Sequence, residues 1–336
     1  MRAVILQKTG NPHSLHISDA PEPKPGPGQV SVKLQFSGIN YAEILSRKGL
    51  YGWAVKRPYI LGMEGSGIIE AVGDGVNPAR VGQAVMVGTQ NGCYAEKIVV
   101  PSVQAIPVIS GFEMSENAAF LVNFMTAWVS LFSLAKLQPG EKVLITAAAG
   151  GVGSAAVQLA VKHGCEVYAL AGNAEKIKFL KSLGVAGAIS YYNADWHNQL
   201  RDASKGLDVV LEMVGGEVFR QAFAMLNPLG RLTIAGYASM DLKKWNPISW
   251  WQTWRDAPKI NIMKLAHKSS AVMATHLGYL LKNPDLMQQT FADLEAFVVA
   301  NNIRPVVGKI FPLENVGDAH QWIESRNSIG KVLLKI

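Results

Sequence analysis

Three closely spaced glycines, Gly150, Gly151 and Gly153, follow a short apolar segment at 143–145. Because glycine has no Cβ, a turn built from them can bend sharply and let a bulky anion approach the backbone. A stretch with helical periodicity comes next, and free N–H groups at the start of a helix bind anions. Ala148 stands where the usual G-x-G-x-x-G pattern has its first glycine, so the flanking strand and helix carry the prediction. This order predicts a binding site for the pyrophosphate of a dinucleotide; the alternative is a glycine-rich turn that binds nothing.

The end of the next apolar segment, 167–170, indicates which dinucleotide would bind. A site for NAD places a carboxylate there, which accepts a hydrogen bond from the ribose. This chain has Gly172 and Asn173 at that point, with Lys176 within one turn. A small residue leaves room for a 2′-phosphate and a lysine supplies the opposite charge, so NADPH is the predicted cofactor; the alternative is that Lys176 is an ordinary solvated lysine. The residues predicted to bind NADPH from these two turns are Gly150, Gly151, Val152, Gly153, Gly172, Asn173 and Lys176.

Length and composition set the general class of protein. The 336 residues suggest about two domains, and the composition, 49% hydrophobic and 17% charged, fits folded domains with sizeable cores. No apolar run reaches the roughly 18 residues that a membrane span needs, and no secretory signal region is evident, so a cytoplasmic protein is expected. Two cysteines give no disulfide framework. The basic residues behind the net charge of +7 are scattered, which favours attraction of an anionic cofactor over nucleic-acid binding.

The segments on either side of the glycine turn indicate the elements that must position it. Before the turn, residues 30–36 alternate apolar and polar side chains, as in a half-buried antiparallel strand. Further short strands are expected there at 67–72, 84–87 and 94–100. After the turn, strands at 188–191, 207–213 and 231–235 alternate with helices at 174–183, 195–203 and 216–226. The tail is expected to form a helix at 286–301, a strand at 306–311, a helix at 314–325 and a strand at 331–336. This pattern predicts an α/β protein in which a doubly wound parallel sheet is inserted into a mostly β domain, with a cleft between the two.

Several stretches of the chain match the motifs of one family. They are residues 37–40, 62–67, 92–96, 147–153 and 330–334. Together they resemble the zinc-independent, zeta-crystallin-like quinone oxidoreductases of the medium-chain dehydrogenase/reductase superfamily. Residues 121–123 with Thr126, and residues 276–280, are most similar to the branch of the synaptic vesicle membrane proteins. The resemblance spans nearly the whole chain and implies a GroES-like, mostly β catalytic domain (1–122 and 275–336) and a Rossmann domain (123–274).

Two positions separate this chain from the zinc-dependent members that it resembles. Those alcohol dehydrogenases have a cysteine where this chain has Asn40, and a histidine where it has Met63. The four cysteines of their structural zinc lobe are missing after residue 96. Since tetrahedral zinc sites need thiolate, imidazole or carboxylate ligands, no metal is predicted.

Without a metal, hydrogen-bond donors must polarise the acceptor, so hydride transfer to a quinone or a conjugated enone or alkenal is expected. The resemblance implies that Tyr51 is a proton donor or an orienting hydroxyl, and a phenol with a pKa near 10 is protonated at pH 7. It implies that Asn40 binds the substrate or the nicotinamide ribose. The alternatives are that Tyr51 only packs among neighbouring aromatic residues and that Asn40 is an ordinary turn residue.

Four more cofactor contacts are implied by the resemblance alone. Thr126 corresponds to a residue at the nicotinamide end and Tyr191 to one near the adenosine, while Gly236 and Arg326 match contacts of lower specificity. An ordinary helix-face threonine and a core tyrosine are the alternatives for the first two. The resemblance also implies a homodimer formed through the sheet edge near 270–275.

A second hypothesis rests on residues 242–268. This segment contains four tryptophans, Trp245, Trp250, Trp251 and Trp254, among six lysines and arginines. Aromatic and basic residues together suit a membrane interface, although Pro247 and Pro258 argue against one continuous amphipathic helix. The segment leaves open a protein that binds NADPH and touches lipid or a partner protein with little or no turnover. A loop that covers the substrate cleft or packs at a dimer interface is the simpler alternative.

Overall fold

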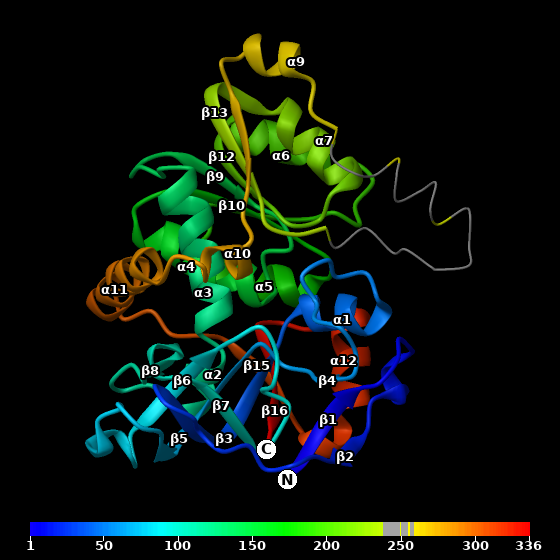
Figure 1. Cartoon of the computed structure of the whole chain (residues 1–336). Coiled ribbons are helices and arrows are strands. Elements are labelled where there is room, and N and C mark those ends of the chain that lie inside the picture. The colour runs from blue at the N-terminus through cyan, green and yellow to red at the C-terminus, as the bar shows by residue number, and fades with distance from the viewer. Residues whose placement is uncertain (238–248, 250–254, 256–258) are drawn as a thin grey trace. The chain divides into compact units, whose positions relative to one another are not determined.

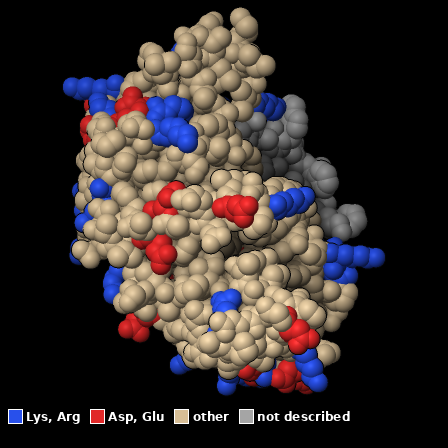
Figure 2. Space-filling view, turned by 60° about the vertical axis from the view of Figure 1, so that its left-hand side comes forward, with Lys and Arg blue, Asp and Glu red and all other residues tan. Residues whose placement is uncertain are grey.

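The computed structural model describes residues 1–237, 249, 255 and 259–336. The chain forms two compact units (Figure 1). The first unit combines Met1–Val122 with Arg304–Ile336, and the second is Asn123–Ile303. On the face drawn in Figure 2, acidic and basic side chains are interspersed, in keeping with the scattered charge of the sequence.

The first unit is built mainly from strands. Its central strand β3 (Gln29–Ile39) pairs antiparallel with β5 (Glu64–Val72), β7 (Lys97–Pro101) and β16 (Lys331–Lys335). The sheet order is β15-β16-β3-β5-β6-β8, where the remaining strands are β15 (Val307–Pro312), β6 (Ala84–Gly88) and β8 (Ala105–Pro107). A smaller sheet has the order β2-β1-β4, from β2 (Ile17–Asp19), β1 (Arg2–Leu6) and β4 (Tyr59–Ile60). The helices of the unit are α1 (Tyr41–Lys48), α2 (Met114–Ala118) and α12 (Val316–Glu324), with short 3-10 turns at Pro12–Ser14, Pro78–Arg80, Ser102–Gln104 and Leu313–Asn315.

Alternation along β3 produces the core of this unit. Val30, Val32 and Leu34 are buried in one cluster with Ile69 of β5 and Val85 of β6. Successive side chains of a strand point to opposite faces, so this period of two buries one face of the sheet. The core therefore holds β3, β5 and β6 in a fixed register.

The second unit is a six-stranded sheet in the order β11-β10-β9-β12-β13-β14, and every pairing in it is parallel. Its strands are β9 (Lys142–Ile145), β10 (Glu166–Ala171), β11 (Gly187–Ser190), β12 (Leu207–Glu212), β13 (Leu226–Ile234) and β14 (Ala271–Ala274). Its helices are α3 (Leu121–Trp128), which begins in the first unit, α4 (Gly151–Lys162), α5 (Ala174–Ser182), α6 (Trp196–Ser204), α7 (Gly216–Ala224), α9 (Ile262–Ala266), α10 (Leu277–Leu280) and α11 (Pro284–Ala300), with a π-helical turn at Val129–Leu134. The order confirms the predicted doubly wound parallel sheet.

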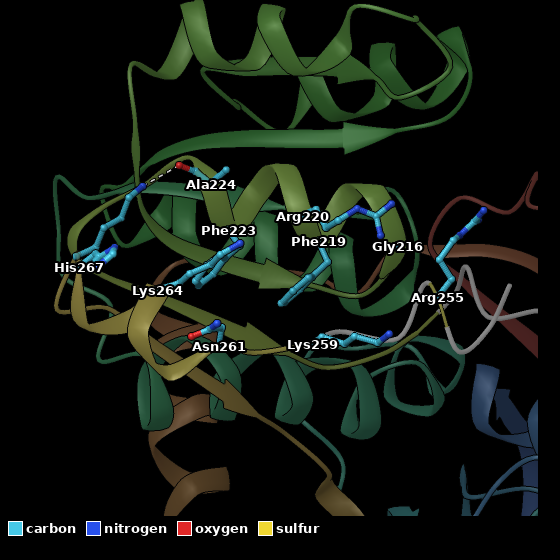
Figure 3. Close-up of a pocket in the computed structure, with 11 residues that line it drawn as sticks. Gly216, Phe219, Arg220, Phe223, Ala224, Arg255, Lys259, Asn261, Lys264 and His267 are labelled. Carbon is cyan, nitrogen blue, oxygen red and sulfur yellow. Dashed lines mark hydrogen bonds between the residues drawn. The ribbon is translucent and has the colours of Figure 1, made fainter. Parts of the chain in front are cut away.

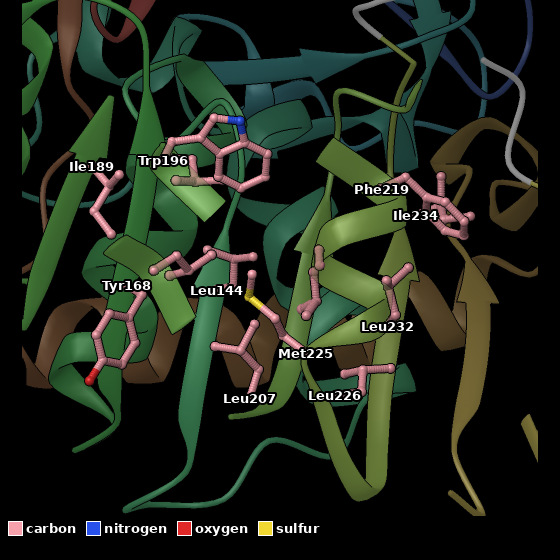
Figure 4. Close-up of a cluster of buried hydrophobic side chains, with 14 residues drawn as sticks. Leu144, Tyr168, Ile189, Trp196, Leu207, Phe219, Met225, Leu226, Leu232 and Ile234 are labelled. Carbon is pink, nitrogen blue, oxygen red and sulfur yellow. The ribbon is translucent and has the colours of Figure 1, made fainter. Parts of the chain in front are cut away.

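Helices cover this sheet on both faces. On one face, Leu144 and Leu232 of the strands pack against Trp196 of α6 and Phe219 of α7 (Figure 4). The alternate strand residues, such as Val143, are also fully buried, as a strand covered on both sides requires. The sheet is thereby fixed along its whole length, and the carboxyl ends of its strands form a rigid edge.

The second unit extends further along the chain than expected. The sequence placed its boundary after residue 274, whereas the compact unit continues to Ile303. Phe297 of α11 explains the difference, because its ring lies 5.6 Å from that of Trp128 and 5.9 Å from that of Phe132, both measured between centroids. The aromatic contacts attach α11 to the unit that contains α3.

Candidate cofactor and active site

The glycine turn lies between β9 and α4, at the carboxyl end of a central strand. Gly150 is the N-cap of α4, and the first bond of the helix runs from the N–H of Ser154 to the carbonyl of Gly150, at 2.8 Å. A Cβ on Gly153 would lie 2.4 Å from the carbonyl oxygen of Ala147, so no side chain fits there. The glycine thus lets α4 approach the turn, and the N–H groups of its first turn need partners from outside the helix.

One residue that the sequence reasoning did not assign lies beside this turn. Asn123 of α3 is 4% exposed, and a Cβ on Gly151 would meet its amide nitrogen at 2.7 Å. Gly151 thus makes room for a buried amide next to the start of α4. Asn123 belongs to residues 121–123, and the resemblance of this stretch to the family was the sequence signal that could have pointed to it.

A cavity of about 450 Å³ opens at the ends of β10 and β11. Gly172, Asn173, Ser190 and Tyr192 are among the residues that line it. Asn173 is the N-cap of α5, and its Oδ1 accepts a hydrogen bond of 3.0 Å from the backbone N–H of Lys176. The side chain of Lys176 is 8% exposed, so it is not the solvated lysine of the simpler alternative. Ligands of doubly wound sheets bind at this edge, and here Gly172 and Asn173 line the cavity, while Lys176 contacts Asn173 through its backbone N–H.

Tyr192 rather than Tyr191 forms the aromatic wall of this cavity. A Cβ on Gly172 would lie 3.0 Å from the Tyr192 ring, which is 65% exposed, whereas Tyr191 packs against the hydrophobic cluster beneath the sheet. The two adjacent tyrosines meet edge to face, with their ring centroids 5.3 Å apart. The sequence analysis assigned a cofactor contact to Tyr191, the more buried of the two tyrosines, and that contact stays a prediction.

The other predicted cofactor residues are divided between the two units. Thr126 on α3 and Gly236 after β13 belong to the second unit and are partly exposed. Arg326 follows α12 in the first unit, where it is exposed and has a left-handed φ of 59°. Asn40 and Tyr51 also belong to the first unit.

Asn40 lies in a buried polar cluster of the first unit. It is the N-cap of α1, its backbone N–H donates a 2.8 Å hydrogen bond to Glu43 Oε2, and its Oδ1 accepts one of 2.6 Å from Lys331 Nζ. Lys331 also forms an ion pair with Glu64, whose second oxygen accepts a 2.9 Å hydrogen bond from the N–H of Val122. Asn40, Glu43, Glu64 and Lys331 are each at most 9% exposed. The cluster joins β3, α1, β5 and β16.

Burial dominates the electrostatics of this cluster. Loss of hydration raises the pKa of Glu43 to about 7, although the charge of Lys331 and two backbone N–H groups act in the opposite direction. The nearby charge of Glu64 raises it further. A carboxyl group in such a place can take up a proton near neutral pH.

The two positions that hold zinc ligands in the related dehydrogenases have a different role here. The Asn40 side chain is bonded to Lys331, and the backbone N–H of Met63 donates a 2.9 Å hydrogen bond to Glu43 Oε1. Amide, thioether and ammonium groups are not zinc ligands. Across residues 1–237, 249, 255 and 259–336, no three His, Cys, Asp or Glu side chains are grouped as metal ligands would be.

Tyr51 is partly buried and packs edge to face against Trp53, with ring centroids 6.4 Å apart. This contact agrees with the packing alternative for Tyr51, and its role as a donor stays a prediction.

A second cavity of the second unit, of about 530 Å³, lies beside α7 and α9 (Figure 3). Phe219 and Phe223 lie along it with nearly parallel rings, and Lys264 of α9 projects toward it. Next to it, Ile262 and Met263 are 78% and 66% exposed. Most of the tryptophan-rich segment predicted to touch a membrane, including Trp245, Trp250, Trp251 and Trp254, lies outside the described residues. In the described part of the chain, no helix is both long and apolar enough to span a bilayer.

Comparison with known proteins identifies the class that this fold and site define. The alcohol dehydrogenase GroES-like domain matches residues 26–110 and the zinc-binding dehydrogenase family matches residues 151–296. The chain belongs to the medium-chain dehydrogenase/reductase superfamily, close to the synaptic vesicle membrane protein VAT-1 homologues. The predicted pairing of a GroES-like β domain with a Rossmann-type domain is therefore confirmed.

Particular relatives cover nearly the whole chain. The human synaptic vesicle membrane protein VAT-1 homolog is 35% identical over 339 residues, which is 99% of this chain and 86% of the relative. Prostaglandin reductase-3 of Bos taurus is 35% identical over 329 residues, 95% of this chain and 84% of the relative. The quinone oxidoreductase of Thermus thermophilus, solved alone and with NADPH, is 31% identical, covers 100% of both chains and superposes with a TM-score of 0.82.

Proposed function

We propose that this chain is a zinc-independent, NADPH-dependent reductase that transfers a hydride to a quinone or to a conjugated enone or alkenal. The observation that carries the proposal is the close approach of the first turn of α4 to the preceding loop, where Gly153 has no space for a Cβ. NADPH, when bound, supplies the hydride. The reductases among the relatives support the reaction class, and the NADPH complex of the Thermus protein supports the cofactor.

The residues at the edge of the sheet fit NADPH. The N–H groups at the start of α4 suit the pyrophosphate, and the cavity at the end of β10 suits the adenosine, with Lys176 near the 2′-phosphate. Gly172 and Asn173, which directly follow β10, carry no charge that would repel that phosphate. Thr126, Tyr191, Gly236 and Arg326 are the further contacts proposed for the cofactor.

The chemistry of the acceptor follows from the donors of the first unit. Asn40 offers an amide N–H and Tyr51 a phenolic O–H, both of which can bind a developing oxyanion. Quinones and conjugated enones need less polarisation than simple ketones, so such donors suffice. A screen of NADPH oxidation with 9,10-phenanthrenequinone, 1,4-benzoquinone and small enones tests this proposal. Turnover of at least one acceptor is expected, and no NADPH oxidation with any of them would refute it.

Replacement of Lys176 tests the choice of cofactor. Lys176→Ala should raise the KM for NADPH by about 10-fold to 100-fold, the value of one charge-assisted hydrogen bond, and leave the KM for NADH unchanged. Lys178→Ala is the matched control, because Lys178 is exposed on the same helix. An equal change for both cofactors would contradict the assignment.

A second candidate function is an NADPH-binding protein that contacts lipid or a partner protein with little or no turnover. The cavity beside α7 favours it, because two phenylalanines, exposed apolar residues of α9 and several lysines come together there. Flotation with liposomes that contain anionic lipid, measured beside the acceptor screen, separates the two functions. Flotation without turnover would favour this candidate, whereas turnover without flotation would favour the reductase.

We also propose a homodimer and a cytoplasmic location. Among the described residues β14 is the last strand of its sheet, so its outer edge can pair with the same strand of a second copy. Light scattering coupled to gel filtration tests the dimer, and a monomeric mass would contradict it.

A further inference from the structure

The buried cluster around Asn40 fixes the direction in which its amide points. A lysine ammonium can only donate hydrogen bonds, so the Asn40 atom that lies 2.6 Å from Lys331 Nζ must be the oxygen. The amide nitrogen then faces Glu43 Oε1 at 3.4 Å, which is an acceptor. Both neighbours therefore select the same orientation, and the described residues provide an acceptor for one N–H of the Asn40 amide, Glu43 Oε1, and none for the other.

The fold makes room for this lysine at a specific point. Lys331 begins β16, which pairs with β3 and brings Val332 opposite Ile39. A Cβ on Gly38 would lie 2.7 Å from the Lys331 Cε and 2.9 Å from the Glu64 Cγ. Gly38 is therefore the gap through which the lysine chain crosses β3 to reach Glu64 and Asn40.

Stability alone does not account for such a cluster. Taking an ammonium and a carboxylate out of water costs several kcal/mol each, and buried ion pairs can often be replaced by apolar residues without loss of stability. Lys331 is 3% exposed and Glu64 is 1% exposed, so both have lost nearly all of their hydration. What the arrangement specifies is the position and polarity of the Asn40 amide.

We propose that Lys331 is a positioning residue of the reductase, which holds the Asn40 oxygen inward so that Asn40 presents an N–H donor to the reacting molecule. The inference rests on the proposed function and names the residue that controls its donor. Glu64 fixes Lys331 in turn, and Glu43 fixes the amide nitrogen. Since Lys331 acts through Asn40, it does not itself touch the acceptor.

A double-mutant cycle tests this dependence. Lys331→Met should lower kcat/KM by about 10-fold to 100-fold in the wild-type background, as expected for one misaligned donor, and should have almost no effect in an Asn40→Ala background. Lys335→Met is the matched control on the same strand, since Lys335 is exposed, and should be neutral in both backgrounds. An equal loss in both backgrounds would overturn the proposal.

Lys331→Met leaves the Glu64 carboxylate buried and unpaired, so a second series of variants must separate a loss of folding from a loss of activity. The cycle is therefore repeated with Lys331→Met and Glu64→Gln made together and compared with wild type, because a glutamine keeps an oxygen for the N–H of Val122 and the two substitutions together leave no unpaired charge. Circular dichroism and urea unfolding show that each variant is folded. The same background dependence is expected, and its absence in the neutral series would overturn the proposal.

Neutron diffraction from the perdeuterated wild-type protein tests the amide orientation without any activity. Three deuterons are expected on Lys331 Nζ and two on the Asn40 atom that faces Glu43. Deuterons on the Asn40 atom that faces Lys331 would overturn the proposal. A wild-type protein that reduces no acceptor would refute the proposed function, while this measurement would still decide the orientation.

Discussion

Glu43 should make the stability of this protein fall as the pH rises toward neutrality. Its carboxyl group is fully buried, and burial raises its pKa to about 7 from 4.5. Glu43→Gln replaces it with a group that stays neutral at every pH and has nearly the shape of the protonated acid. The comparison of the two proteins therefore isolates the cost of charging this site.

The sign and size follow from linkage. The folded state keeps the Glu43 proton up to about pH 7, whereas the unfolded chain releases it near pH 4.5, so the stabilisation is complete below 4.5 and is lost as the pH rises through 7. At about 1.36 kcal/mol for each pH unit between those two values, the loss is about 3 kcal/mol. Relative to Glu43→Gln, the wild-type protein should lose that amount of unfolding free energy between about pH 4.5 and just above 7.

Urea unfolding at a series of pH values measures this difference directly. Titrating groups that are far from Glu43 act on both proteins alike and cancel in the comparison. Glu175→Gln is the control, because Glu175 is exposed on α5, and its difference from wild type should stay constant with pH. A constant difference for Glu43→Gln as well would refute the reasoning, since it would mean that the hydrogen bonds to the carboxylate offset its loss of hydration.

Three further outcomes are expected. Glu324→Gln should lower the unfolding free energy by about 3–5 kcal/mol in urea, because the fully buried guanidinium of Arg47 loses its carboxylate partner. Gly153→Ala should weaken NADPH binding in calorimetry and lower the Tm, whereas Gly150→Ala, whose Cβ would meet its nearest atom at 3.4 Å, should leave the Tm unchanged. His320→Gln should remove a rise of stability between about pH 3 and 6.5, because burial and the charge of Arg47 lower the pKa of His320 from 6.5 to about 3.

For each of these three predictions, a specific result would contradict the reasoning. Glu314→Gln is the control for the buried pair, since Glu314 and its partner Arg2 are both exposed, and equal losses for the two variants would contradict the argument from burial. A Gly153→Ala protein with the wild-type Tm would show that the turn can widen. A pH profile that is the same with and without His320 would mean that the ring can be protonated in place.

Local patterns were sufficient to predict the strands and helices around the glycine turn of the second unit, although not the end of that unit at Ile303. The glycine turn, the apolar strands and the helices between them each depend on neighbouring residues, so the order strand, turn, helix could be read directly from 143–162. The strands of the first unit that were missed are β1 (Arg2–Leu6), β2 (Ile17–Asp19), β4 (Tyr59–Ile60) and β8 (Ala105–Pro107), which contain only two to five residues and so show little alternation. β1 pairs with β2 and β4, and β8 pairs with β6, and such pairing between separate segments leaves no local signal.

The buried cluster was missed for the same reason. Glu43 could have been found, because Asn40 followed by a glutamate three residues later is the pattern of a capping box at a helix start. Glu64 and Lys331 are far from it in sequence, and only the register of β3 with β5 and β16 brings them together. Gly330 and Lys331 were noticed as a family-like motif, but the motif alone does not say what the lysine contacts. Similarly, Tyr191 packs on the hydrophobic cluster while its neighbour Tyr192 lines the cavity, and this difference depends on the packing of residues beneath β11 that are distant in sequence.

The cluster also explains how this chain connects the two positions that carry zinc ligands in the related dehydrogenases. In the zinc-dependent relatives, a shared ion would connect the segments that carry residues 40 and 63. Here one carboxylate connects them, because Glu43 accepts hydrogen bonds from the backbone N–H groups of both Asn40 and Met63. A backbone bridge leaves the side chain at position 40 available, and Lys331 then fixes its orientation. In the reductase that we propose, the position that would hold a Lewis acid therefore presents a hydrogen-bond donor instead, which suits acceptors that are already activated by conjugation.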